Sequence, residues 1–408
     1  MTSSAEPQRQ TPLHAIHERL GATMTSFAGW QMPLRYASEM AEHQAARRAA
    51  GLFDLSHMGE ISVTGPGAGA ALDYALTGYL SAVPTGRARY TMICAEDGGV
   101  LDDLVVYRTG EQEFLVIANA ANTSVVLEQL RSRAGSYDAE VTDATGDYAL
   151  IAIQGPAAAS ILAPLVSGAD LSAMKYYAGA FGSVAGRRAW VARTGYTGED
   201  GFEVYCAPAD AAAVWDALAS AGAPAGLIPA GLAARDTLRL EAGMPLYGNE
   251  LGPDLTPFEA GLGRVVKFDK PGDFVGREAL AARAAAGPRR RLVGLTVQSR
   301  RVARHGYPVL ADGEQVAEGS GAIRARGVPG GQSVPPRQVG TVTSGAPSPT
   351  LGVPIAMAYL DTGAGSDDGA GAGAGAGAGP GKLDLAVGIR GEAVPAHLTD
   401  LPFYRRRQ

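Results

Sequence analysis

The sequence predicts a mixed α+β fold, in which two related α/β lobes are followed by a separate all-β domain. A chain of 408 residues is too long for one ordinary hydrophobic core, so two or three domains are expected. A unit of strand, Gly-Pro turn and helix occurs twice in the first part of the chain, and the composition changes at residues 284–288. Short strand-like runs after that change indicate the all-β domain.

The repeated unit supports two similar lobes. Residues 61–72 and residues 151–162, which begin 90 positions apart, share a strand-like run, a Gly-Pro pair and an alanine-rich helix. We expect Pro66 and Pro156 to occupy the first turn of these helices. The first copy also imitates a glycine-rich dinucleotide-binding turn, but proline removes an amide donor there. An internal repeat is therefore the better explanation.

The composition argues against several classes of function. A net charge of −6 provides no basic surface for nucleic acid, so no nucleic-acid partner is expected. Cys94 and Cys206 are the only cysteines, and the six histidines lack ligand spacing, so neither a disulfide framework nor a metal is expected. No apolar run reaches the roughly 18 residues of a membrane span, and residues 1–10 lack an apolar signal core. We therefore predict a cytoplasmic protein without a membrane partner.

Residues 98–107 are the leading candidate for the chemistry. Two glycines precede an Asp-Asp pair and an apolar run of strand type. Alternate strand residues face opposite sides, so Asp103 and Tyr107 share one face, while Asp102 shares the other with core residues. A carboxylate at the mouth of a strand, beside an aromatic ring, suits acid–base chemistry on a flat ligand. Ordinary turn chemistry after two glycines is the alternative.

A second polar patch covers residues 193–205, with three glycines and three carboxylates. A loop of this kind that leads into a strand suits a polar ligand. Glu203 lies inside the apolar strand, where an inward-facing carboxylate needs a partner. Arg235 lies near the start of a predicted helix, where its charge opposes the helix dipole. It is either solvated or binds an anion.

Asp54, Ser56 and His57 imitate a catalytic triad within four positions. Triad residues usually come from distant parts of a chain, and no G-x-S-x-G turn is present. We therefore interpret His57 as a satisfied structural histidine, with ligand contact as the alternative.

Two segments interrupt the all-β region. Residues 318–337 are rich in Gly, Arg and Pro, and residues 363–381 are almost entirely Gly and Ala. Such compositions cannot bury a core, so surface loops are expected.

Taken in order, the motifs resemble the aminomethyltransferase (T-protein) family of the glycine cleavage system. Each motif alone is weak, but the ordered set is highly specific and covers about residues 11–405. The set comprises Thr11-Pro12-Leu13, Phe27–Trp30, Phe53–Gly59, Gly98–Tyr107, Arg193–Glu203, Gly231–Glu241, Thr343–Gly345 and Ser348–Gly352.

The resemblance implies a three-domain cloverleaf around a central folate cavity, with a C-terminal barrel or jelly roll. It assigns residues 1–57 and 148–260 to a first, folate-binding α/β lobe. Residues 58–147 and 261–288 form the second lobe, and residues 289–408 the β domain with its two insertions.

The resemblance also implies a reaction. The lipoyl-bearing H-protein presents an aminomethyl group, and the one-carbon unit passes to the co-substrate tetrahydrofolate. Ammonia, 5,10-methylenetetrahydrofolate and the dihydrolipoyl carrier are the products, and the P- and L-proteins of the system are functional partners. No metal is implied.

Site residues follow from the matched motifs. In this family the second Asp of the pair orients folate N10 and handles its proton, a role that falls on Asp103. Glu203 would grip the amino-pyrimidine edge of the pterin, and Arg235 and Arg405 would face the glutamate tail. Further folate contacts carry over to Met58, Tyr90, Tyr107, Asn119, Tyr176 and Tyr196.

Two related classes are the alternatives. Flavin oxidases of dimethylglycine or sarcosine carry this module fused to a nucleotide-binding domain, and we find no such additional domain in the sequence. Non-catalytic folate-binding proteins of the same fold serve iron–sulfur assembly. They carry a Cys-containing motif where this chain has residues 273–278, which contain no cysteine.

Overall fold

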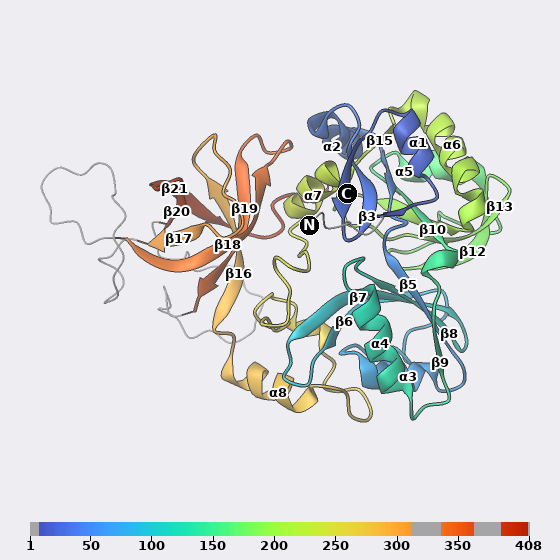
Figure 1. Ribbon diagram of the computed structural model, residues 1–408, viewed down its shortest axis with the longest axis horizontal. Coiled ribbons are helices and arrows are strands. Elements are labelled where there is room, and N and C mark those ends of the chain that lie inside the picture. Colours follow the sequence, from blue (N-terminus) through green and yellow to red (C-terminus); the bar gives the residue numbers. More distant parts are fainter. Residues whose placement is uncertain (1–7, 312–335, 363–384, 407–408) are drawn as a thin grey trace, which may run out of the picture.

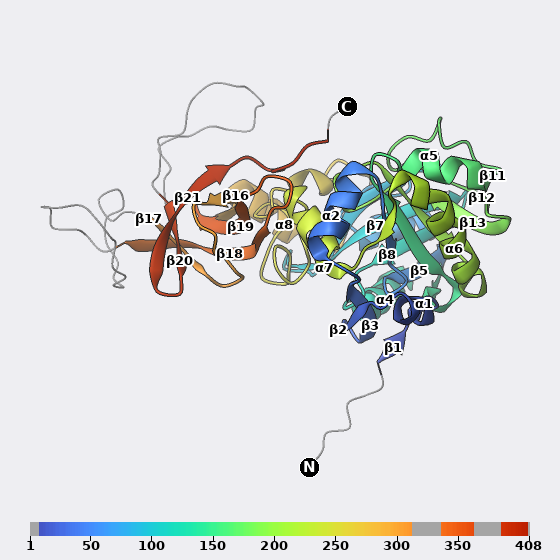
Figure 2. The ribbon, with the colours of Figure 1, turned by 90° about the horizontal axis from the view of Figure 1, so that it is seen from above.

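The computed structural model describes residues 8–311, 336–362 and 385–406. Figure 1 shows three bodies, namely two lobes of sheet and helix, one above the other, and a β-barrel beside them. The barrel also lies at one end of the molecule when it is seen from above (Figure 2). This arrangement confirms the predicted fold class. Within the described ranges, no helix is long and apolar enough to cross a membrane.

The upper lobe of Figure 1 is built on a seven-stranded sheet. Its strands, in spatial order, are β11 (Val166–Ser167), β12 (Gly179–Val184), β13 (Arg187–Ala192), β14 (Gly201–Cys206), β10 (Ala149–Gln154), β4 (Gly51–Asp54) and β15 (Ile228–Pro229). Three helices share a core with one face of this sheet, and they are α1 (His14–Arg19), α5 (Ala158–Leu162) and α6 (Ala211–Gly222). On the barrel side lie α2 (Glu39–Arg48) and α7 (Leu232–Glu241).

Local signals explain the start of this lobe. The small sheet β1 (Arg9–Gln10), β3 (Trp30–Arg35), β2 (Thr23–Phe27) contains a hairpin that turns through Ala28 and Gly29, with φ of 48° and 80°. Two left-handed residues suit the twist of a tight hairpin. The aromatic segment around Trp30 is therefore a strand and turn, not a helix. Ser38 caps α2 by accepting a hydrogen bond from the amide of Ala41.

The lower lobe is built on a five-stranded sheet. In spatial order the strands are β6 (Ala88–Cys94), β7 (Val100–Gly110), β8 (Glu113–Ala118), β5 (Gly59–Thr64) and β9 (Glu140–Asp143). Helices α3 (Ala68–Ala75) and α4 (Thr123–Ala134) pack on one face of the sheet around Ile61, Val106 and Val116. The later helix α8 (Arg277–Ala286) joins a second cluster on β6 and β7 through Leu280.

The C-terminal domain is a closed barrel of six strands. Around the barrel they are β16 (Arg290–Val297), β19 (Pro354–Asp361), β18 (Arg337–Pro347), β17 (Pro308–Ala311), β20 (Leu385–Ile389) and β21 (Glu392–Thr399). Of the two predicted insertions, residues 318–335 and 363–381 lie outside the described residues, and β18 begins at Arg337. The domain boundaries given above stay a proposal.

The repeated unit forms equivalent turns in the two lobes. Gly65 follows β5 with φ of 114°, and Gly155 follows β10 with φ of 143°. A Cβ at either position would lie within 2.7 Å of a backbone oxygen, so only glycine fits. The prediction that Pro66 and Pro156 occupy the first turn of these helices is wrong, because both prolines precede the helices. Helices α3 and α5 begin at Ala68 and Ala158, because the Gly-Pro pair completes the turn before each helix.

The sheets of the two lobes face each other. One buried apolar cluster contains residues of both sheets, among them Tyr107, Leu115 and Ile117 from the lower lobe and Phe53, Leu150 and Tyr205 from the upper lobe. Arg87 and Ala178 also form an isolated antiparallel bridge between the lobes. Side chains on these facing surfaces therefore either pack together or, where the sheets diverge, line a cavity.

Candidate active site

A cavity of about 750 Å³ lies between the facing sheets and α7. Strands β6 to β8 form one wall, β14 another, and α7 with its following loop and strand β2 complete the enclosure. This volume is typical of small-molecule and cofactor sites. Seven predicted site residues line the cavity, namely Met58, Tyr90, Asp103, Asn119, Tyr196, Glu203 and Arg235.

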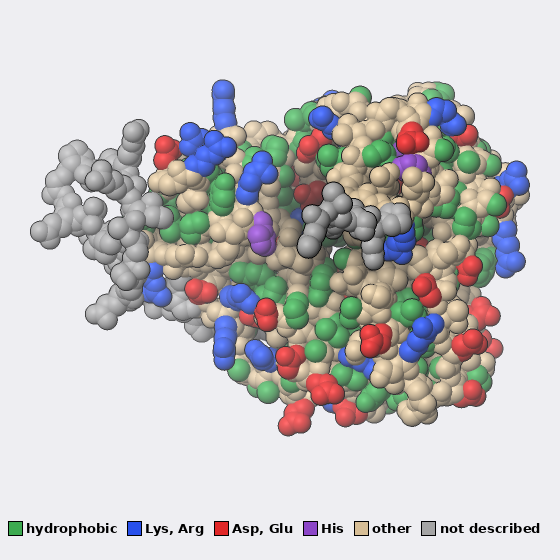
Figure 3. Space-filling view, in the orientation of Figure 1, with side chains coloured by type: hydrophobic (Ala, Val, Ile, Leu, Met, Phe, Trp, Pro, Cys, Tyr) green, Lys and Arg blue, Asp and Glu red, His purple; other side chains and the backbone are tan. Residues whose placement is uncertain are grey.

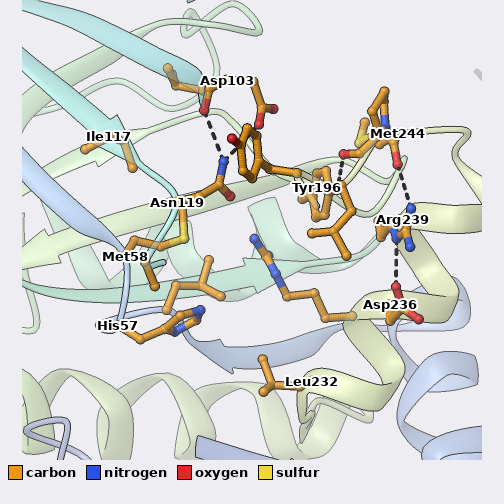
Figure 4. Close-up of a pocket in the computed structure, with 18 of the residues that line it drawn as sticks. His57, Met58, Asp103, Ile117, Asn119, Tyr196, Leu232, Asp236, Arg239 and Met244 are labelled. Atoms are coloured by element: carbon orange, nitrogen blue, oxygen red, sulfur yellow. Dashed lines mark hydrogen bonds and ion pairs between the residues drawn. The ribbon is translucent and has the colours of Figure 1, made fainter. Parts of the chain in front are cut away.

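Strand register brings Asp103 together with its partners. The pairing of β7 with β8 puts Asn119, just beyond the end of β8, opposite Asp103. On the other side Met92 of β6 pairs with Asp103, so Tyr90 lies diagonally across on the same face. The Asn119 Nδ2 atom donates to Asp103 Oδ1 at 2.8 Å (Figure 4), and Tyr90 Oη donates to Oδ2 at 2.9 Å.

The environment of Asp103 favours proton uptake. Burial raises the pKa of its carboxyl group above the ordinary value, and the hydrogen bonds from Tyr90 and Asn119 offset only part of this effect. A carboxylate with raised proton affinity in the wall of a cavity is suited to act as a general base. The residue that strand alternation selected therefore has both the position and the chemistry for the predicted role.

Glu203 lies on the opposite sheet, where hydroxyl groups hold one of its oxygens. Its Oε2 accepts hydrogen bonds from Thr194 Oγ1 at 2.6 Å, Tyr107 Oη at 3.2 Å and Tyr205 Oη at 3.4 Å. Within the described part of the chain, Oε1 receives no hydrogen bond. The three hydroxyls thus fix the carboxylate and leave an acceptor for a ligand.

Arg235 is a partly buried cation without an anionic partner among the described residues. It lines the cavity from α7, with its guanidinium carbon 4.8 Å from the centre of the Tyr196 ring. The Tyr196 hydroxyl donates to the carbonyl of Pro245, which holds the ring in place. Burial lowers the pKa of Arg235, yet arginine stays protonated in proteins. This favours the anion-binding alternative over the solvated one.

His57 differs from the prediction of a satisfied structural histidine. Its ring is 3% exposed and lines the cavity, and no described residue bonds to its Nδ1 atom. Burial, followed by the charge of Arg235, lowers the pKa of His57 to about 4. The motif forms no triad, because Asp54 instead accepts from His17 Nε2 at 2.9 Å in the core of the upper lobe.

Three predicted folate contacts lie outside the cavity wall. Tyr107 is fully buried behind Glu203, because β7 continues from the cavity into the packed interface between the sheets. Tyr176 is 45% exposed, and its neighbour Tyr177, with φ of 59°, lines the cavity instead. Arg405 is exposed near the C-terminus and is not part of the wall.

The wall also contains aromatic residues that were not among the predicted site residues, among them Tyr177 and Tyr247. The left-handed backbone that turns Tyr177 inward is uncommon for a residue other than glycine, so no sequence pattern announces it. Tyr247 lies on an irregular loop after α7. Its proximity to Asp102 and Asp103, whose charges add to the burial that raises its pKa, arises only in the folded chain.

A second buried polar cluster joins α2, α7 and the barrel. Glu241 Oε2 lies 2.9 Å from Arg47 Nη2, 3.1 Å from His43 Nε2 and 2.7 Å from Thr350 Oγ1. Burial raises the pKa of Glu241, but hydrogen bonds and charges from His43, Ser348 and Arg47 outweigh it and lower the pKa to about 2. The motif at residues 348–352 therefore fastens the barrel to the upper lobe.

Charges on the molecular surface are mixed. On the face shown in Figure 3, Lys and Arg side chains alternate with Asp and Glu over both lobes. In the described ranges, no group of three or more His, Cys, Asp or Glu side chains could hold a metal ion.

Comparison with known proteins decides the family. Residues 13–270 match the family model described as the GCVT N-terminal domain, and residues 290–405 match the glycine cleavage T-protein C-terminal barrel domain. The chain belongs to the glycine cleavage T-protein family. The family predicted from the ordered motifs is thereby confirmed.

T-protein relatives match over almost the whole chain. An aminomethyltransferase of Saccharopolyspora erythraea is 60% identical over 98% of each chain, and one of Streptomyces avermitilis is 58% identical over 99% of this chain and 100% of the relative. The crystal structure of glycine cleavage system aminomethyltransferase T from Bartonella henselae has a TM-score of 0.83 and 32% identity. This match covers 98% of this chain and 99% of the other. The similarity therefore includes both lobes and the barrel.

Proposed function

We propose that this T-protein is an aminomethyltransferase that passes a one-carbon unit from an aminomethyl-lipoyl carrier to tetrahydrofolate and releases ammonia. The observation that carries this proposal is the pair of carboxylates, Asp103 and Glu203, on opposite walls of one cavity that also contains the unpaired cation Arg235. The curated relatives bear the name aminomethyltransferase.

The residues of the cavity fit a reduced folate. The free oxygen of Glu203 suits the donors on the amino-pyrimidine edge of a pterin, because a carboxylate accepts strong hydrogen bonds from such an edge. The Tyr90, Tyr177 and Tyr196 rings line the cavity and suit a flat ring system. Arg235 suits a carboxylate of the glutamate tail. The three predicted contacts outside the wall are proposed only as supporting or peripheral residues.

The folate, when bound, supplies N5 as the acceptor of the one-carbon unit and N10 as the nitrogen that closes the ring. Asp103 orients N10 and takes up the proton that it loses. Asn119 and Tyr90 hold the Asp103 carboxylate in the required direction. Holding both reactants in one cavity supplies much of the remaining acceleration.

We also propose the partners that this reaction needs. The lipoyl-bearing H-protein would deliver the aminomethyl group, and the P- and L-proteins would be linked through the same carrier. Cys94 and Cys206 are both free and buried, which supports a reducing compartment such as the cytoplasm.

A turnover assay tests the function. Purified protein is mixed with tetrahydrofolate and an aminomethyl-loaded lipoyl carrier, and ammonia is measured. We expect folate-dependent ammonia release that falls by roughly 10²- to 10⁴-fold in Asp103→Asn, the usual contribution of a general base, while folate still binds. Asp170→Asn, a change at a fully exposed carboxylate, is the matched control.

The outcomes separate the alternatives. Folate binding without turnover by the wild type would point to the non-catalytic folate-binding class. An Asp103→Asn variant as fast as the wild type would remove Asp103 from the mechanism.

A further inference from the structure

Asp102 is a fully buried carboxyl group next to the cavity that the proposed mechanism does not use. Its Oδ1 atom accepts from Asn119 Nδ2 at 2.8 Å and from Asn122 Nδ2 at 2.7 Å, and its Oδ2 atom accepts from the Asn119 backbone amide at 3.0 Å. A carboxyl group that is buried at this depth and receives three donors is built into the site and does not merely end a turn.

One amide group joins Asp102 to Asp103. The Asn119 Nδ2 atom lies 2.8 Å from Asp102 Oδ1 and 2.8 Å from Asp103 Oδ1. The two carboxylate oxygens are therefore at most twice this distance, about 5.6 Å, apart. Like charges at such a separation strongly oppose each other's ionisation.

We propose that Asp102 is a positioning residue for the one-carbon transfer, which fixes the Asn119 amide that aims the Asp103 carboxylate at the N10 proton. This inference rests on the proposed function, in which Asp103 takes up that proton. With Asp102 in place, Asn119 Nδ2 has both carboxylates as acceptors and also lies 3.2 Å from the Asp103 carbonyl oxygen, so turning the amide to present its oxygen to Asp103 would lose these bonds.

The surroundings of Asp102 leave Asp103 as the dominant electrostatic neighbour. Among the described residues, the titratable groups near the pair are tyrosines, namely Tyr90 from β6, Tyr177, Tyr196, and Tyr247 from the loop after α7. Asn122, next to the start of α4, is neutral. Burial, followed by the charge of Asp103, raises the pKa of Asp102 to about 7. Two carboxyl groups coupled in this way titrate in two steps that belong to the pair.

The activity test compares Asp102→Asn with the wild type in the ammonia-release assay across pH. We expect kcat to fall about tenfold, as is common for residues that orient a reacting group, with KM for tetrahydrofolate nearly unchanged. Because Asp102→Asn frees the Asn119 amide, and the hydrogen bond from that amide lowers the pKa of Asp103, the acid limb of the kcat profile should move to higher pH. A loss of kcat with an unmoved acid limb would overturn the proposal, since a purely structural defect has that effect.

A second measurement does not depend on the folding of Asp102→Asn. Carboxyl ¹³C NMR of the wild type and of Asp103→Asn, both labelled at aspartate, follows the titration of Asp102. The charge of Asp103 raises the pKa of Asp102 when the two carboxyl groups are held close together, so the Asp102 midpoint should fall in Asp103→Asn. An equal midpoint in the two proteins would overturn the proposal.

The proposed function can fail separately from this inference. If Asp103→Asn turns over at the wild-type rate, the role of Asp103 is wrong and the inference about Asp102 falls with it. If Asp103→Asn is inactive but neither the acid limb nor the Asp102 midpoint moves, only the inference about Asp102 is wrong.

Discussion

The cavity and the barrel junction both contain clusters of charged and polar side chains. The two clusters differ in whether the charged groups have partners within the protein. At the junction, Glu241 has Arg47, His43 and two hydroxyl groups as partners. In the cavity, Arg235 has no anionic partner among the described residues and lines open space.

The direction of the pKa shifts reflects this difference. Partners lower the pKa of Glu241 to about 2, despite burial, whereas burial raises the pKa of Asp103 despite its two hydrogen bonds. A fully paired carboxylate stabilises the fold, and a carboxyl group with raised proton affinity is available for chemistry. A structural cluster and a ligand site therefore differ in whether every charged group has a partner within the protein. Both clusters come from polar sequence motifs.

The largest expected effect comes from breaking the junction. Glu241→Gln leaves Arg47 with Glu199 as its remaining carboxylate partner and removes the carboxylate beside His43. Removing one partner of a buried pair typically costs about 3–5 kcal/mol. We expect a loss of unfolding free energy of this size, measured by urea denaturation, with a smaller loss of turnover per folded molecule. Glu128→Gln, at an exposed position of α4, is the control. A stable but inactive variant would contradict the structural role.

The same variant has a pH signature. The folded-state pKa of Glu241 lies below the ordinary value of 4.5, so its stabilisation is present above pH 4.5 and is lost as the pH falls toward 2. The difference in stability between the wild type and Glu241→Gln should shrink across this window. A difference that stays constant would show that ionisation of Glu241 is not its source.

Within the cavity, Arg235→Met should weaken folate binding. A hydrogen bond to a charged group contributes about 1.5–3 kcal/mol, so we expect Kd for tetrahydrofolate to rise by roughly 10- to 150-fold. Stability should change little, because Arg235 is only partly buried and has no ion-pair partner among the described residues to lose. Fluorescence titration measures Kd for tetrahydrofolate. Arg131→Met, at an exposed position of α4, is the control. Unchanged Kd would place the glutamate tail elsewhere.

Glu60 provides a third kind of buried carboxyl group. It is fully buried on β5, and neither of its oxygens has a partner among the described residues. Burial, followed by the charges of Asp143 and Glu203, raises its pKa well above the ordinary value. The native state therefore holds the proton more tightly than the unfolded chain, so Glu60 costs stability as the pH rises above about 4.5.

Glu60→Gln removes this titration. We expect the stability of the variant relative to the wild type to increase from pH 5 to pH 8, because only the wild type has a buried carboxyl group whose proton becomes costly to keep or to lose as the pH rises. Thermal unfolding at the two pH values measures the gain. An equal difference in stability between the variant and the wild type at pH 5 and pH 8 would show that Glu60 stays ionised or finds a partner in solution.

The smallest effect is expected at Tyr107, which lies behind Glu203. Tyr107→Phe removes one of three hydroxyl donors to Glu203 Oε2, and one net hydrogen bond contributes about 0.5–1.5 kcal/mol. Kd for tetrahydrofolate should therefore rise about 2- to 12-fold. Tyr205→Phe, which removes the longest of the three contacts, should have a still smaller effect. A much larger loss for Tyr107→Phe would mean that this hydroxyl contacts the ligand directly.

The sequence predicted the cavity residues that regular strands carry. Asp103 followed from strand alternation in β7, and Glu203 from its place inside an apolar strand. Prediction failed where the position depends on irregular backbone or on the depth of burial. Tyr177 replaces Tyr176 in the wall because of a left-handed residue, and Tyr107 leaves it because β7 extends into the sheet interface. His57 looked structural because nothing local indicates that its ring lacks a partner.

The sequence by itself determined the two related lobes, the all-β C-terminal domain, the family and which carboxylate of the Asp pair faces the cavity. These follow from periodicity, turn chemistry and ordered motifs, which are local properties of the chain. Only the tertiary structure decided which polar residues become fully paired and which are left open to a ligand. That distinction separates Glu241 from Arg235, and it depends on neighbours from distant segments that no local pattern specifies.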